Sequence, residues 1–108
     1  MYTLKETTTY IQETFPENEI TEERVEECYI EITNPANRIK GNDEPWVACE
    51  EEHELNSVLT AMDKILVNMD EDKVKDRIEY VCQVFQSKEI SHKPRIPFYV
   101  LVLDWEMA

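Results

Sequence analysis

The side chains best able to do chemistry in this sequence are carboxylates, and they crowd into one part of the chain. Residues 13–54 hold fourteen acidic residues against three basic ones, which leaves −11 of the net charge of −13 in this segment. The densest stretch, TEERVEECYIEI at 21–32, contains a single cation, Arg24. Two groups of acids predict a surface that binds a partner: Glu22, Glu23, Glu26, Glu27 and Glu31 in this stretch, and Glu50, Glu51, Glu52 and Glu54 in the EEEHE run.

The spacing of the first group indicates what the partner is. On a helix, Glu23, Glu27 and Glu31 follow one another at four-residue steps of about 6 Å, close to two nucleotide steps of about 3.4 Å along one DNA strand. Each like-charge pair at this spacing costs about 0.2–0.5 kcal/mol, so a face selected only for solubility would mix the signs. The pattern predicts a row of carboxylates that imitates phosphates and binds a basic protein. A solvated acidic face without a partner is the alternative.

Other groupings of reactive side chains are incomplete. Cys49 and His53 are four residues apart, as two zinc ligands on a helix would be, but a zinc site needs about four ligands. The acids of 68–79 resemble a calcium loop, yet Lys73 stands where that loop requires glycine. Gly41 is the one glycine in the chain, which argues against a glycine-rich phosphate loop. We expect no catalytic residues, no metal and no cofactor, and therefore a protein that is not an enzyme.

The cysteines and the N-terminal segment bear on the compartment. Cys28, Cys49 and Cys82 are odd in number and widely spaced, which favours buried thiols in a reducing environment over a disulfide framework. MYTLKETTTYIQETF has no cationic start followed by an apolar run, and no apolar stretch approaches the roughly eighteen residues of a membrane span. We expect a soluble protein without membrane contact, in the cytoplasm, or in the host cytoplasm if the protein is viral.

Hydrophobic periodicity predicts the elements that position these residues within one domain, 1–108. Apolar residues at helical spacing predict helices over 3–15, 21–33, 51–69 and 71–88. Thr21 and Asp70 are predicted N-caps, and the last two helices are predicted to form an antiparallel hairpin. A strand over 28–33 is the rival to the second helix. The segment 34–45 is expected to be a surface loop or small hairpin.

The C-terminal run RIPFYVLVLDW predicts a strand buried on both faces. Its partner would be residues 28–33, the PWVAC segment or a second copy, and the last case would make a homodimer. A short buried helix with Pro97 at its first position is the alternative. The expected fold is α+β and helix-dominated, with a central antiparallel helix hairpin and a small sheet that includes the C-terminal strand, or else all-α. The aromatic residues are expected to fill the core rather than an interface; they are Trp46, Phe98, Tyr99 and Trp105.

These observations favour a non-enzymatic inhibitor. The composition resembles that of small acidic inhibitors made by viruses or paired with nuclease toxins. We expect an anti-defence protein of the anti-CRISPR or anti-restriction type, acting on a basic nucleic-acid-binding protein. An immunity protein or antitoxin against a nuclease toxin, and a structural or adaptor subunit, are the alternatives. Direct nucleic-acid binding is disfavoured because the basic residues form only one small cluster, at Lys88, His92, Lys93 and Arg95.

Overall fold

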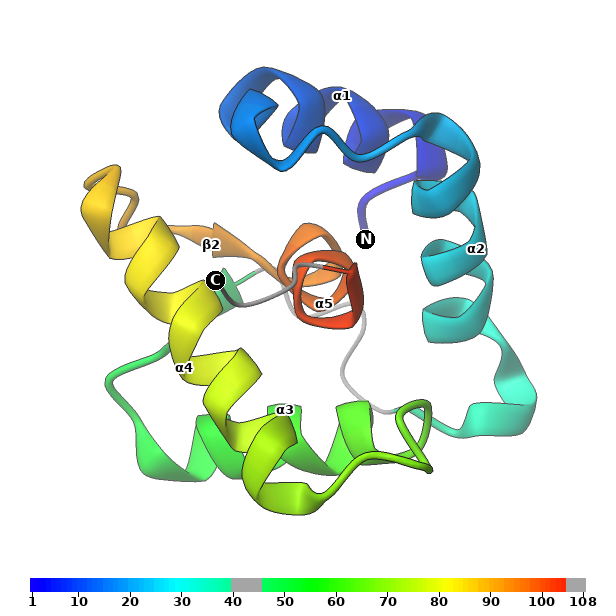
Figure 1. Cartoon of the computed structure of the whole chain (residues 1–108), viewed down its shortest axis with the longest axis vertical. Helices are drawn as coiled ribbons and strands as arrows, with labels where there is room; N and C mark the ends of the chain where they lie inside the picture. The colour runs from blue at the N-terminus through cyan, green and yellow to red at the C-terminus, as the bar shows by residue number, and fades with distance from the viewer. Residues whose placement is uncertain (40–45, 105–108) are drawn as a thin grey trace.

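A helix, α5 (Arg95–Asp104), occupies the centre of the molecule and is seen end-on in Figure 1. The computed structural model describes residues 1–39 and 46–104. Every α5 residue from Arg95 to Leu103 is buried. Four helices contact α5 from different sides: α1 (Leu4–Thr14), α2 (Glu22–Thr33), α3 (Glu52–Asp63) and α4 (Glu71–Ser87). The domain is thus organised around one enclosed segment.

The sequence of α5 explains its place. A helix that is apolar on all sides must be buried, and α5 is apolar from Ile96 to Leu103. Phe98 lies 5.7 Å from the Phe85 ring of α4, between ring centroids, and Phe85 lies 4.9 Å from Phe15, so an aromatic cluster links α5 to the chain that follows α1. A proline is tolerated in the first turn of a helix because that N–H has no intrahelical partner.

The strand predicted for this segment is therefore wrong, and the short buried helix is the correct alternative. Pro97 lies in the first turn, although two residues later than the first position. A continuous apolar run fits a buried strand and a buried helix equally well. The helix prevails because it satisfies its own backbone hydrogen bonds while α1–α4 cover all of its sides.

A small sheet is present, which makes the fold helix-dominated α+β, as predicted. In the described part of the chain it pairs β1 (Trp46–Val47) with β2 (Lys93–Pro94), antiparallel, with Trp46 opposite Pro94. The sheet lacks the predicted C-terminal strand. Val47 enters the core. The prediction that Trp46 fills the core is wrong, since its side chain is 47% exposed and its ring lies 5.0 Å from the His92 ring, between centroids. Phe98 and Tyr99 are buried as predicted.

The outer helices begin where the sequence indicates. The Thr21 hydroxyl accepts a hydrogen bond from the Arg24 backbone N–H (3.1 Å), and the Asp70 carboxylate accepts one from the Asp72 N–H (3.3 Å). These caps confirm the starts of α2 and α4. The helix predicted over 3–15 is confirmed as α1, which runs from Leu4 to Thr14, and the rival strand over 28–33 is wrong because these residues continue α2.

The helix predicted over 51–69 is shorter than expected, since α3 ends at Asp63. Its last turn tightens, with backbone N–H groups of Lys64 and Ile65 donating to the carbonyls of Ala61 and Met62. The chain then turns through a connector, residues 64–70. This turn brings Ile65 and Leu66 to the side of α2 instead of carrying them away along a straight helix.

The predicted hairpin of α3 and α4 is present in that the two consecutive helices pack on each other, but α4 leaves α3 obliquely and rises to the upper left of Figure 1. Of the predicted loop 34–45, residues Pro35–Asn37 form a 3₁₀ turn and residues 40–45 lie outside the described residues. Trp105 also lies outside them. Within the two described ranges, no helix combines the length and the apolar character needed to cross a bilayer.

Candidate partner-binding surface

The five acids of α2 share the face that points away from the core. Val25, Cys28 and Ile32 are buried, and α2 packs on α5. The opposite face carries two rows at four-residue steps, one with Glu22 and Glu26 and the other with Glu23, Glu27 and Glu31. All five acids are exposed, so the structure brings the first predicted group together on one helix face.

The one cation within α2 is largely occupied elsewhere. Arg24 donates from Nε to Asp104 Oδ1 at the end of α5 (2.9 Å) and from Nη2 to the Leu103 carbonyl (3.4 Å). It also donates from Nη1 to Glu27 Oε2 (3.1 Å). Arg24 therefore ties α2 to α5 and offsets the charge of Glu27 alone among the five acids.

The remaining α2 carboxylates have few partners. Glu31 Oε2 accepts a hydrogen bond from Asn37 Nδ2 (3.3 Å), which leaves its charge uncompensated. Among the described residues, Glu22, Glu23 and Glu26 form no ion pair through their carboxylates. Four negative charges are therefore presented together without a matching cation in the described part of the chain.

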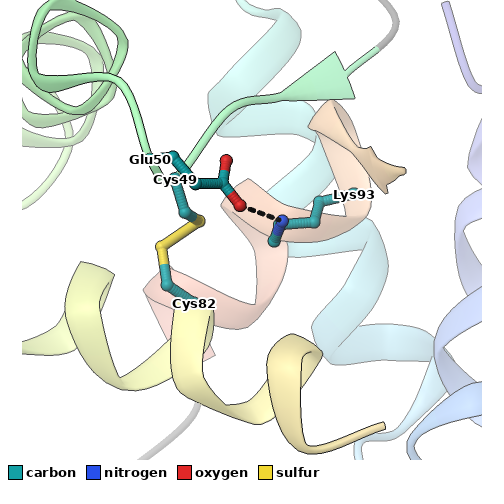
Figure 2. Close-up of a disulfide and its surroundings, with 4 residues drawn as sticks. All are labelled: Cys49, Glu50, Cys82 and Lys93. Atoms are coloured by element: carbon teal, nitrogen blue, oxygen red, sulfur yellow. Dashed lines mark ion pairs between the residues drawn. A yellow bond between two sulfur atoms is a disulfide. The ribbon is translucent and has the colours of Figure 1, made fainter. Parts of the chain in front are cut away.

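The second predicted group lies elsewhere. The start of α3 is on the lower left of Figure 1 and α2 on the right, with α5 between them. Glu50, Glu51 and Glu52 are exposed there. Glu50 faces Lys93 (Oε1 to Nζ, 3.8 Å; Figure 2), and Glu51 lies 3.3 Å from His53 Nε2. The nine predicted residues therefore do not form one continuous surface.

Glu54 differs from its neighbours because it belongs to the interior. Its side chain is 14% exposed and forms an ion pair with Arg95, whose side chain is 4% exposed. Arg95 also donates to the Tyr99 hydroxyl (3.1 Å) and the Trp46 carbonyl (2.6 Å). Burial lowers the pKa of Arg95, but the hydrogen bonds to Tyr99 and Glu54 outweigh this and raise it. Glu54 thus stabilises a buried cation, and we leave it out of the surface.

The predicted basic cluster is dispersed in a similar way. Lys93 and Arg95 are each 4% exposed, so neither presents its charge to solvent. Lys88 pairs with Glu17 (Nζ to Oε1, 2.9 Å). The close spacing of these residues in the sequence predicted a surface patch. The sequence signal against it is that Lys93 and Arg95 directly precede the apolar run, so they can be buried together with that run.

The cysteines differ from the prediction. Cys49, before α3, and Cys82, in α4, form a disulfide with a Cα–Cα distance of 6.1 Å (Figure 2). The packing of α4 against α3 brings together two residues that are 33 positions apart, which sequence spacing could not indicate. Cys28 remains a free, buried thiol, and burial raises its pKa to about 11. Among the described residues, no group of three or more His, Cys, Asp and Glu is placed to hold a metal.

A groove beside the acidic face was not predicted. It has a volume of about 360 Å³ and lies between α2, the connector and the end of α5. Its lining comprises Arg24, Glu27, Cys28, Ile30, Glu31, Ile65, Leu66 and Leu103. The sequence signal is Ile30, which continues the row of Glu22 and Glu26 and is 54% exposed. The groove itself needs three segments to meet, which sequence alone does not show.

Comparison with known proteins does not assign this surface. No family model matches the chain, and no curated protein or solved structure is significantly similar to it. The acidic face and the groove are therefore interpreted from their own chemistry.

Proposed function

We propose that this protein is a non-enzymatic inhibitor that occupies the nucleic-acid-binding surface of a basic protein, as anti-CRISPR and anti-restriction proteins of viruses do. The observation that carries the proposal is the outer face of α2. Four of its acids are exposed and form no ion pair with a cation among the described residues: Glu22, Glu23, Glu26 and Glu31. An uncompensated field of one sign steers a partner of the opposite sign.

The arrangement of the charges supports a phosphate mimic over a diffuse acidic surface. The residues that hold the α2 helix in place are buried, and Arg24 ties the helix to Asp104 at the end of α5. A packed helix keeps the backbone spacing of its carboxylate-bearing residues when a partner approaches, so less backbone ordering is needed on binding. Glu23, Glu27 and Glu31 are then spaced about 6 Å apart along the helix axis. This spacing is close to the distance between every second phosphate along the axis of one DNA strand.

We propose the cytoplasm, or the host cytoplasm for a viral protein, as the compartment of action, because nucleic-acid-processing proteins work there. A reducing cytoplasm would keep Cys49 and Cys82 as thiols. The proposal therefore requires α3 to remain on the core without the disulfide. The ion pair of Glu54 with Arg95 and the buried Leu59 support this.

The test removes three charges from α2 without changing side-chain size. The partner is captured from host lysate, identified by mass spectrometry and titrated with the wild type and with the triple variant Glu23→Gln, Glu27→Gln, Glu31→Gln. An exposed ion pair is worth about 0.2–1 kcal/mol, so we expect about a tenfold loss of affinity, larger at low salt. Nucleic acid added to the titration should compete with the protein.

The matched control removes the same number of charges from the other group, by Glu50→Gln, Glu51→Gln, Glu52→Gln. This variant should bind within about twofold of the wild type if α2 is the binding face. Equal losses in both variants would show a response to net charge alone and contradict the mimic. Capture of a nuclease toxin would identify the protein as its immunity protein, and capture of assembly subunits would identify an adaptor.

A further inference from the structure

The acidic face of α2 contains an apolar feature that phosphate mimicry does not require. Ile30 lies four residues after Glu26, in the position that would extend that row, and is 54% exposed. It lines the groove of about 360 Å³ together with Ile65 and Leu66 of the connector. An acidic surface that imitated only a phosphate backbone would gain nothing from an aliphatic residue at this point.

The groove has an apolar base and a charged rim. Leu103, the last buried residue of α5, contributes to the lining and is 6% exposed. Glu27 and Glu31 line the same groove from α2 and are both exposed. Arg24 neutralises only Glu27 and is itself held by Asp104. A ligand seated here would bury an apolar group and meet negative charge at the same time.

We infer that this groove receives an aliphatic side chain of the basic partner protein, from a segment in which lysine or arginine residues flank that side chain and face Glu27 and Glu31. The inference rests on the proposed function and names the partner's contact chemistry. Charge complementarity selects this occupant. A second copy would bring another net charge of −13 and a second acidic rim against the first.

The first experiment uses two synthetic peptides as probes. One is an amphipathic helical peptide of lysine and leucine, and the other has the same length and charge but serine in place of leucine. Methyl NMR of the protein follows Ile30, Leu66 and Leu103 during each titration. We expect the leucine peptide to shift these methyl signals and to bind about tenfold more tightly than the serine peptide. Equal affinities, or shifts that miss the groove, would overturn the inference.

The second experiment compares two exposed aliphatic residues. Ile30→Gln changes the groove, whereas Val67→Gln changes a residue that is 72% exposed and does not line it. With the leucine peptide and with the captured partner, we expect Ile30→Gln to lower affinity about tenfold, by the same factor at low and high salt, since the lost contact is apolar. Val67→Gln should have no effect. Equal losses in the two variants would indicate non-specific apolar attraction and overturn the inference.

The outcomes also separate this inference from the proposed function. If the Glu23, Glu27 and Glu31 triple variant loses affinity for the captured partner while Ile30→Gln does not, the proposed function is supported and the inference about the groove is overturned. If neither variant loses affinity, both the proposed function and the inference about the groove are overturned. Analytical ultracentrifugation tests whether the groove is occupied by a second copy of the chain. A wild-type dimer that the Ile30→Gln substitution dissociates would assign the groove to a second copy and overturn the inference.

Discussion

Helices α2 and α5 are close in length and pack on each other, yet they are opposite in character. In α5, nine consecutive residues are buried. In α2, three residues are buried and five acids face solvent. Under the proposed function, stability and recognition are assigned to different helices. Substitutions in α5 should therefore change folding, and those on the outer face of α2 should change binding with little effect on folding.

The largest expected effect tests the role of α5. Leu101→Asp places a carboxylate at a position with no exposure, which should cost about 5 kcal/mol or more and unfold the domain. Circular dichroism melts provide the measurement. The matched control, Val67→Asp, should change the stability by no more than about 0.5 kcal/mol. A cooperative melt of Leu101→Asp near the wild-type temperature would contradict the buried position of α5.

A smaller effect is expected from the covalent link between α3 and α4. The double variant Cys49→Ser, Cys82→Ser should lose about 3–4 kcal/mol, as estimated for a loop of this length, but should remain folded. Urea denaturation compares the variant with the wild type, with and without reductant. A thiol titration of the unreduced protein should detect one thiol after denaturation and none before, because Cys28 is buried and its pKa is about 11. Detection of three thiols would show that the disulfide is absent.

The buried ion pair gives a similar or slightly smaller effect. Glu54→Gln removes a negative charge from beside the buried guanidinium of Arg95 and should cost about 3 kcal/mol. Glu51→Gln makes the same chemical change at an exposed position and should be almost neutral. Equal stabilities of the two variants, measured by urea denaturation, would place Glu54 on the surface with its neighbours.

The smallest effect on stability is expected for α2 itself. Replacement of Glu23, Glu27 and Glu31 by Gln removes two like-charge pairs at four-residue spacing and one at three-residue spacing, worth about 0.2–0.5 kcal/mol each, and it also removes the Glu27–Arg24 pair. The free energy of unfolding should therefore change by less than about 1 kcal/mol, while affinity for the partner falls. A large loss of stability in a thermal melt would show that the acidic face has a structural role.

Sequence predicted those parts of the fold that depend on local chemistry. The caps at Thr21 and Asp70 and the spacing of apolar residues identified α2 and α4 because these signals act within one helix. For the run after Pro97 there is no periodicity, so helix and strand could be separated only by knowing that α1–α4 surround it. The end of α3 was missed for a related reason, since the apolar spacing continues beyond Asp63 although the chain turns.

The same distinction between local and long-range signals applies to the candidate site. The α2 acids could be predicted because one helix presents them all. Glu54 looked like Glu50–Glu52 in sequence, and only the position of Arg95 in the fold distinguishes it. The disulfide and the groove each need segments that are distant in the chain, so local patterns carry no signal for them.

The central position of α5 also has a consequence for how the chain folds during synthesis. The helices that enclose it leave the ribosome first, and until α5 emerges their apolar faces have no common segment to pack on. Contacts between α5 and α1 join residues about eighty or more positions apart, so the core closes late and through long-range contacts. The nascent chain therefore exposes apolar surface until α5 has emerged, a state in which it would be a substrate for chaperones.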